Sequence, residues 1–507
     1  MAQELKSINL VAPGFKGINT EDAPLAQDPS FAEVADNAVI DKRGRVAARK
    51  GLNVVTTTKT ELGSEKIRAI KEYRDDAGNT KIFSTGNNKI LSGETTLADE
   101  TPVSYTISAD EWKMVNFNDN IYFFQRAHEP LVYNNTSGSV VKLSTVTGAA
   151  GVASTMYGHE VLSAYGRLWT ADFSTDKSTV YWSDLLIGHD WSGGTSGSIN
   201  ISKVWPDGHD EIVALAAHNN LLIIFGKRSI VVYAGADAPA TMALQDTVAG
   251  VGCVGRDTVQ YTGTDVLFLS QTGLRSFGRT IQEKSMPITS LSSTITKDII
   301  QLINETGELY KSVYFPEENF YLITFSNQDM TYCFDTKGTL ENGAYRVTRW
   351  PGTGFTAYER KDDGTLLIGG AHGLGNYSGY QDNGSSYPFK YFSPELSFGD
   401  PSKLKFLKKI RPTIVGGSGL DILFKWDYDF GSAYNAAFIT LSSQATAEFG
   451  VDEFNIGQFS SGILTSKQAI NANGSGGTLS IGLETAINGG ELSLQEINIL
   501  ALVGKTI

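Results

Sequence analysis

Three pairs of adjacent carboxylates are the residues best placed for acid–base chemistry: Asp75-Asp76, Glu317-Glu318 and Asp362-Asp363. A hydrolase needs two such groups that converge on one cleft. Each pair here stands in a predicted turn before an apolar strand, where Asp and Glu face water and support turn geometry. We therefore predict that none of them is catalytic.

The histidines and a glycine-rich segment could indicate a metal or a cofactor. Gly-His-Asp occurs twice, at His189-Asp190 and His209-Asp210, but the spacing matches no zinc pattern and cysteine partners are missing. Gly250–Gly255 spells the dinucleotide fingerprint, which works only between a strand and a helix. Strand and turn residues follow it instead. We expect no catalytic residue, no metal and no cofactor, and therefore no enzyme.

Four tryptophans could form a glycan-binding surface, because exposed aromatic rings stack on sugars. Trp169 and Trp182 lie inside predicted strands, so we expect them to pack in a core. Trp191 and Trp205 lie in a Gly/Ser-rich connection. For these two residues, both a core position and a glycan site remain open.

The basic strip is the densest run of cations and consists of Lys403, Lys405, Lys408, Lys409 and Arg411. Leu404 and Phe406 alternate with the first two lysines as on a half-buried strand, and the phase slips at Leu407. One interpretation is a solvated strand face or a charged edge that blocks mispairing. The others are a docking strip for an acidic protein surface and a contact with DNA. We favour the protein interface among the functional interpretations, because cations around a narrow bore would hold phosphates strongly.

The composition limits the class of protein. The 507 residues contain 42 Lys and Arg against 55 Asp and Glu, a net charge of −13. An acidic chain is unlike a general nucleic-acid coat, although DNA could still slide through a passage that binds phosphate weakly. Two cysteines exclude a disulfide scaffold. The opening MAQELKSINLVAPGFKG lacks a signal-peptide core and no apolar run reaches membrane-spanning length, so we expect synthesis in a cytoplasm and no membrane insertion.

An internal repeat predicts the fold. Seven times, a turn cluster leads into an apolar strand, a second turn and another strand; these first strands contain Ile82, Ile121, Leu168, Leu221, Val266, Phe320 and Leu366. A hairpin cannot bury its apolar face alone, so the units must pack against one another. A period of about 40–50 residues with several strands per unit is typical of a β-propeller blade. We predict an all-β protein with a propeller of six or seven blades; a large β-sandwich is the alternative.

The sequence pattern changes after about residue 385, where the predicted strands are longer and no longer follow the spacing of the blades. We predict an extended N-terminal segment over 1–60, a propeller over 61–384 and a β-sandwich-like platform over 385–507. The first segment could close the ring by adding strands to the last blade or to the platform. Helical spacing is confined to Ser293 to Thr306 and to a shorter segment, Phe31 to Ala38.

The order of several short motifs resembles the tail nozzle, or tail stabilisation, proteins of short-tailed bacteriophages. The motifs are Gly17-Ile18-Asn19, Pro24, Ala35-Asp36-Asn37, Lys42-Arg43-Gly44 and Arg49-Lys50-Gly51. The runs VYWSDLLIGHDW, DEIVALAAHNNLLIIFGKRSIVVYAG and VGCVGRDTVQYTGTDVLFLSQTGLRSF resemble blades of that family, and Lys-Lys-Ile-Arg-Pro with Gly416-Gly417 resembles its C-terminal platform. The resemblance covers most of the chain.

The resemblance implies a structural role in the virion tail. Such proteins form a ring of six below the portal and adaptor, contact other tail proteins, extend the DNA channel without reading sequence, and retain the genome until ejection. They offer no catalytic residues to carry over. Two other classes remain as alternatives: a propeller that binds or cleaves glycans, and a receptor-binding tail protein.

Overall fold

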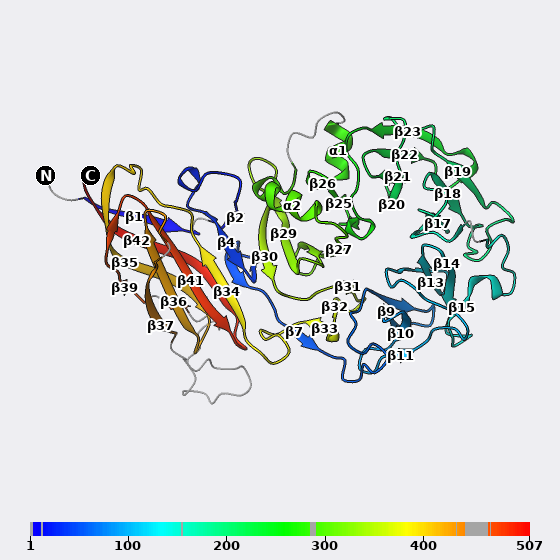
Figure 1. Cartoon of the computed structure of the whole chain (residues 1–507), viewed down its shortest axis with the longest axis horizontal. Coiled ribbons are helices and arrows are strands. Elements are labelled where there is room, and N and C mark those ends of the chain that lie inside the picture. The colour runs from blue at the N-terminus through cyan, green and yellow to red at the C-terminus, as the bar shows by residue number, and fades with distance from the viewer. Residues whose placement is uncertain are drawn as a thin grey trace.

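The computed structural model describes residues 4–11, 14–153, 156–283, 290–431, 433–441, 465–466 and 468–506. The chain forms a ring of radially arranged sheets beside a two-sheet sandwich, and both termini lie at the far end of the sandwich (Figure 1). Strands dominate and the two α-helices in the described residues are short. The predicted all-β class, with a propeller and a C-terminal sandwich, is confirmed.

The propeller consists of six four-stranded blades and one three-stranded sheet within the described residues. The four-stranded blades preceding the three-stranded sheet are β8–β11 (Ala69–Arg74, Thr80–Gly86, Lys89–Ser92, Ala98–Asp99), β12–β15 (Lys113–Phe117, Asn120–Gln125, His128–Tyr133, Val141–Lys142), β16–β19 (Glu160–Ala164, Arg167–Ala171, Thr179–Trp182, Gly197–Asn200) and β20–β23 (Ile212–His218, Leu221–Gly226, Ile230–Ala234, Ala243–Val248). There follow β24–β26 (Gln260–Tyr261, Val266–Ser270, Gly273–Ser276), β27–β30 (Tyr310–Phe315, Phe320–Phe325, Met330–Thr339, Tyr345–Pro351) and β31–β33 (Ala357–Arg360, Leu366–Gly370, Gly373–Tyr377). Each of the seven predicted repeat strands is the second strand of one of these units.

The ring closes in two ways. Its innermost elements contact one another in turn, and β31 of the last blade reaches β8 of the first. The last blade takes its fourth strand from the N-terminal segment, because β7 (Leu52–Val54) pairs antiparallel with β33. A strand from one end of the chain therefore completes the blade formed near the other end of the propeller.

The platform is a sandwich of two sheets. One sheet contains β35 (Lys403–Gly416) and β42 (Leu492–Thr506), extended by β1 (Glu4–Leu10), β6 (Val46–Ala48), β5 (Ala38–Ile40) and the short strands β38 (Thr465–Ser466), β39 (Ile470–Asn471) and β40 (Ser475–Gly476). The other contains β34 (Tyr387–Phe392), β41 (Leu479–Ile487), β36 (Asp421–Tyr428) and β37 (Asn435–Thr440). This second sheet continues through β4 (Val34–Asp36) into blade strand β30.

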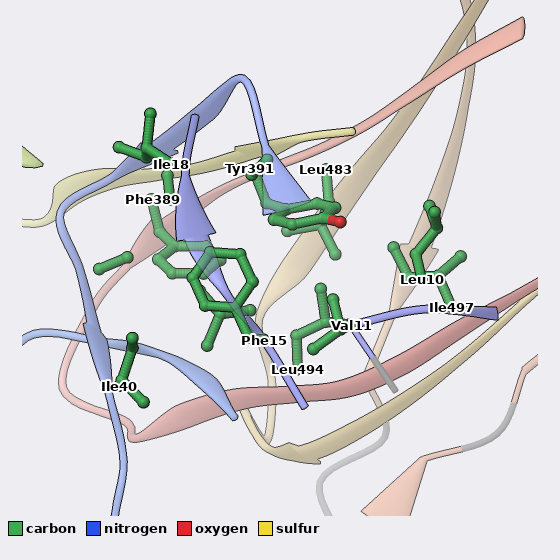
Figure 2. Packing of buried hydrophobic residues seen from close by; sticks show 14 of the residues in the cluster. Leu10, Val11, Phe15, Ile18, Ile40, Phe389, Tyr391, Leu483, Leu494 and Ile497 are labelled. Carbon is green, nitrogen blue, oxygen red and sulfur yellow. The ribbon is translucent and has the colours of Figure 1, made fainter. Parts of the chain in front are cut away.

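The core between the two platform sheets also holds the start of the chain. Figure 2 shows Leu10, Val11, Phe15 and Ile18 against side chains from both sheets, among them Phe389, Tyr391, Leu483, Leu494 and Ile497. These residues are almost fully buried. Burying one large apolar side chain stabilises a fold by about 1.5–3 kcal/mol, so the N-terminal segment is an integral part of the platform.

The two helical predictions had opposite outcomes. The segment from Ser293 forms a 3₁₀ turn, Ser293–Ile295, followed by α2, Thr296–Ile303, as predicted. The helix predicted over Phe31 to Ala38 is wrong: this segment forms β3 (Phe31–Ala32), β4 and the start of β5. Hydrogen bonds to β2 (Gly17–Ile18), β30 and β34 override a weak helical spacing.

The remaining described elements are short. They are α1 (Phe277–Glu283) and the 3₁₀ turns Pro24–Ala26, Leu143–Thr145, Pro239–Thr241 and Arg256–Thr258, the last labelled η5. No helix in the described part of the chain is long and apolar enough to cross a membrane.

Candidate functional site

Three of the motifs that carry the family resemblance, around Gly17, Asp36 and Arg49, meet where the propeller joins the platform. Strand β4 lies between β30 of the propeller and β34 of the platform, and pairs with both. Asp36 Oδ1 accepts a hydrogen bond from Arg349 Nε at 2.5 Å. Asn37 has a positive φ of 53°, and its amide group donates to the carbonyl of Pro388 at 2.7 Å. One short motif thus connects both parts of the molecule.

Arg49 is the centre of this joint and is only 2% exposed. Its guanidinium makes a two-pronged ion pair with Asp382, at 2.9 and 2.6 Å, and donates from Nε to Asn37 Oδ1 at 2.8 Å. It also stacks over the ring of Tyr387, 4.2 Å from the centroid. A planar fork with several fixed partners suits arginine and no other side chain.

Two glycines of the same motifs allow close backbone approach. A Cβ on Gly51 would lie 1.9 Å from the carbonyl oxygen of Gln381, and one on Gly17 would lie 2.6 Å from the amide nitrogen of Val347. Gly17 also has a φ of +92°, which L side chains rarely adopt. The joint is therefore packed backbone against backbone, which fixes the orientation of the platform on the propeller.

Charged side chains fill the propeller axis. The turn η5, just before the three-stranded sheet, brings Arg256 and Asp257 to the axis, where Arg256 Nε lies 2.8 Å from Asp257 Oδ1. Lys311 Nζ lies 2.7 Å from both Asp257 Oδ2 and Glu111 Oε2. Buried Glu160 pairs with Lys113 Nζ at 2.6 Å. Two depressions of about 490 and 270 Å³ are both lined by Arg256 and Asp257, so this pair separates them.

The protonation states of the axis follow from this pairing. Burial alone would raise the pKa of Asp257, but Arg256 and Lys311 outweigh it and hold that pKa well below 3.8. Burial, followed by the neighbouring charge of Arg256, lowers the pKa of His159 far below 6.5. Asp257 is thus ionised and His159 neutral near pH 7. Burial also raises the pKa of Glu160, although Lys113 and Arg256 oppose this shift.

The three carboxylate pairs lie in turns, as predicted: between β8 and β9, β27 and β28, and β31 and β32. Asp75 does not face water as predicted: it is 9% exposed and binds Asn79 and Asn135. The other two pairs form ion pairs that tie neighbouring parts of the ring together. Glu317 pairs with Arg360 at 2.5 Å and Glu318 with Lys50 at 2.5 Å. Asp362 of the last blade pairs with Arg74 of the first at 2.8 Å. These contacts support ring closure.

The Gly-His-Asp motifs support turns. Asp190 Oδ1 accepts from the amides of Ser192 and Gly193, and Asp210 accepts from the amides of Glu211, Lys227 and Arg228. Among the described residues, no group of three or more His, Cys, Asp or Glu is arranged to hold a metal ion. Gly250–Gly255 connects β23 to η5, and strand β24, not an α-helix, follows that turn.

All four clustered tryptophans belong to the core. Trp169 and Trp182 are 0% and 6% exposed, as predicted. Trp191 and Trp205 are 6% and 4% exposed, so the glycan-stacking interpretation of these two is wrong. Their connection folds back onto the blades, where Trp191 packs against Phe124 with ring centroids 6.2 Å apart. A Gly/Ser-rich composition concealed this contact.

The basic strip divides into an exposed and a buried part. Lys408, Lys409 and Arg411, called the exposed strip below, face solvent and form no ion pair with the described residues. Lys403 pairs with Asp400 at 3.4 Å. Strand β35 lies between β42 and the short strands β38–β40, so the charged-edge interpretation is wrong.

Lys405 does not belong to the surface predicted for the strip, because it is 1% exposed. Its amine donates to the carbonyl of Gly477 at 2.6 Å and to that of Asp400. Burial lowers the pKa of this lysine. Irregular pairing between Lys403 and Lys405, and again between Leu407 and Lys409, changes the phase of the strand, which places Lys405 inside and leaves Leu404 and Phe406 half-exposed.

Two groups of residues were absent from the sequence prediction. The axis charges come from strands far apart in the chain, and the adjacency of Arg256 and Asp257 is their only local signal. The second group is an acidic pocket on the platform, which includes Glu33 and Glu395. These two residues are separated by most of the chain, so no motif could bring them together.

The chain matches no family model and no curated protein sequence. Its fold is similar to that of several solved propeller proteins. PorZ of Porphyromonas gingivalis, described as an essential bacterial surface component of the type-IX secretion system, is 13% identical with a TM-score of 0.36, covering 64% of this chain and 37% of PorZ.

Two further structures show the same kind of likeness. The extracellular domain of BT4673 from B. thetaiotaomicron is 10% identical with a TM-score of 0.42, covering 78% of this chain and 48% of that one. The Pan2 WD40 domain of Neurospora crassa is 7% identical with a TM-score of 0.38, covering 65% and 94%. This chain therefore spans less than half the length of the PorZ and BT4673 structures, and these likenesses concern the fold alone.

Proposed function

We propose that the protein is a structural component of a short-tailed phage virion: a tail nozzle subunit that forms a ring of six below the portal and adaptor. The ring extends the DNA channel and retains the genome until ejection. The observation that carries the proposal is the position of the resembling motifs. Residues around Gly17, Asp36 and Arg49 all lie at one joint, as expected for motifs that preserve the shape of an assembly subunit.

The propeller axis supports the same role. Paired charges lie on this axis and divide it into two separate depressions. We therefore do not place the DNA passage along the axis of a single propeller. The passage belongs instead between subunits, around the symmetry axis of the ring. In this arrangement the propeller is a rigid wall element. The exposed strip on the platform is then available for a neighbouring protein.

The glycan-binding alternative has lost its candidate residues, since the tryptophans that would stack on sugars are buried. The nozzle proposal is tested by measuring the mass of the purified full chain by light scattering and by cryo-electron microscopy of virus particles that contain it. We expect six copies beneath the portal. A monomeric chain that is absent from tails, or one that turns over an oligosaccharide, would overturn the proposal.

A further inference from the structure

A pocket of about 310 Å³ on the outer face of the platform combines carboxylates with aromatic rings. Glu33 stands just before β4 and Glu395 just after β34. Phe392, Phe430 and Tyr434 form aromatic walls; Phe430 is 58% exposed and Tyr434 is 42% exposed. The rings of Phe392 and Tyr434 lie edge to face, with centroids 5.8 Å apart.

Two buried carboxylates in or beside this acidic pocket each keep one oxygen without a hydrogen-bond partner among the described residues, although Asp427 Oδ1 accepts from the amide of Tyr428 at 2.8 Å. Glu395 is 8% exposed, and its buried Oε2 accepts no hydrogen bond from the described residues. Asp427, likewise 8% exposed, has an unpartnered Oδ2 beside Gly431, which lines the pocket. No cation among the described residues pairs with Glu33 or Glu395, and nearby Lys425 pairs with Glu484 at 2.8 Å. Buried carboxylates are normally paired.

Electrostatics favour a cationic guest here. Burial, and then the proximity of Glu395, raises the pKa of Glu33. Burial also raises the pKa of Glu395, against hydrogen bonds from Thr478 and the Phe430 backbone, and the neighbouring Asp429 and Asp427 add to the rise. These acids thus repel one another, and an ammonium or guanidinium group would relieve the repulsion. Aromatic faces attract the same groups. The pocket is chemically complementary to a lysine or arginine side chain.

The exposed strip supplies such side chains on the opposite side of the platform. Lys408, Lys409 and Arg411 lie on the outer face of the sheet containing β35 and β42, and the acidic pocket lies on the outer face of the sheet containing β34, β36 and β41. Two complementary patches on opposite faces cannot meet within one chain. Between copies they form a head-to-tail contact, which closes into a ring when the rotation allows.

We infer that the acidic pocket receives a lysine or arginine of the exposed strip from a second copy of this chain. The contact rests on the proposed function, since it explains how neighbouring platforms of a ring adhere. Glu33 and Glu395 bind the cation, while Phe430 and Tyr434 cover its aliphatic stem and exclude water. Charge complementarity selects the second copy as the occupant.

Two charge-reversed chains test the contact. The pocket variant carries Glu33→Lys, and the strip variant carries Lys408→Glu with Lys409→Glu. Alone, each variant sets like charges against each other, and we expect its ring association to weaken about 100-fold or more. An equimolar mixture restores complementary charges at every contact if the variants alternate, so the mixture forms rings with an even number of subunits. Native mass spectrometry identifies the alternating composition.

A matched control separates this contact from a general effect of charge. Lys203 and Arg228 are exposed cations on the propeller that form no ion pair with the described residues, and the Lys203→Glu, Arg228→Glu chain makes the same change in net charge as the strip variant. It should assemble like the wild type. Circular dichroism and urea unfolding verify that each variant folds, and Glu33→Gln replaces Glu33→Lys if the lysine disturbs folding, with weakened association then expected from this chain alone.

The outcomes distinguish this contact from the proposed function. Rings that form normally from either variant alone overturn the contact but leave the nozzle role intact. Loss of rings in both variants without rescue in the mixture also overturns it, and indicates that the strip and the pocket bind different partners. If wild-type rings form only in particles, the same chains are compared by their incorporation into tails. Wild-type chain that never forms a ring, alone or in particles, refutes the nozzle role itself.

Discussion

The propeller axis and the platform surface differ in whether their charged side chains form ion pairs within the chain. At the axis, Arg256, Asp257 and Lys311 pair with one another and with their neighbours inside one chain. On the platform, the exposed strip and the acidic pocket hold cations and carboxylates that find no ion-pair partner among the described residues. The two regions have similar secondary structure, so the fold does not explain this difference.

This contrast separates what holds the subunit together from what it offers to other molecules. A network of paired charges contributes rigidity within one chain. Unpaired charges of both signs on two faces of one sandwich are better explained by intermolecular contact. The joint between the regions then holds the platform in a fixed orientation relative to the propeller.

The largest expected effect is that of Arg49→Met, which removes the central side chain of the joint between the two regions. The substitution leaves Asp382 and Asn37 without their buried partner, and breaking a buried ion pair typically costs about 3–5 kcal/mol. We expect a loss within this range and not above it, because the Asp382 side chain is 33% exposed and water can replace part of the lost contact. Urea unfolding should also change from one transition to two, because the platform and propeller lose their coupling.

The exposed pair Arg74–Asp362 provides the control for Arg49. Both of its side chains are 56% exposed, so Arg74→Met should change the unfolding midpoint little. A single, unshifted transition for Arg49→Met would show that β4 and the apolar core alone hold the two regions together.

The second prediction concerns the axis, where Lys311→Met removes one of two cations from Asp257. We expect a loss of about 3 kcal/mol in unfolding free energy at pH 7. In the wild type, the depressed pKa of Asp257 contributes stability that is fully present above the unfolded pKa. This contribution is lost as pH falls through the folded pKa. The variant lacks part of it, so the difference between the two chains should narrow below about pH 4.

Urea unfolding at a series of pH values measures this difference. Lys203→Met is the control, because Lys203 is exposed and its loss changes the net charge equally. A difference between wild type and Lys311→Met that stays constant from pH 7 to pH 3 would mean that lost packing, and not the charge network, determines the effect.

The sequence predicted features that depend on local patterns. Turn clusters followed by apolar strands gave the seven repeat units, and helical spacing located the segment from Ser293. Features that depend on distant pairing were missed. Phe31 to Ala38 became strand because β30 and β34 bind it. Trp191 and Trp205 are buried because their connection folds back onto the blades.

The candidate sites also depend on pairing between distant segments, which the sequence does not reveal. The density of cations located the basic strip, but irregular strand pairing determines which side chains reach solvent, and that pairing is a property of β42 as well as β35. The acidic pocket brings Glu33 beside Glu395. Neither residue stands out in its own segment, so only the folded chain reveals the pocket.

The smallest expected effect concerns the difference between the buried and the exposed lysines of the basic strip. Lys405→Met removes a buried amine whose hydrogen bonds satisfy two carbonyls, and leaving buried acceptors unpaired costs about 1–3 kcal/mol. The pKa of Lys405 is lowered in the folded chain, so the charged amine destabilises the fold below that pKa. The free energy of unfolding should therefore rise with pH between the folded pKa and 10.5. The Lys405→Met chain should lack this alkaline rise.

Lys409→Met should have the opposite profile, with an unfolding free energy within about 0.5 kcal/mol of the wild type. Its effect should appear in the association of subunits, because the exposed amine of Lys409 is available to the acidic pocket of a neighbour. Urea unfolding and light scattering on the two variants separate the roles of residues only four positions apart. Equal loss of stability in both would mean that the strip is structural throughout, and the contrast between a self-paired propeller and an open platform would not hold.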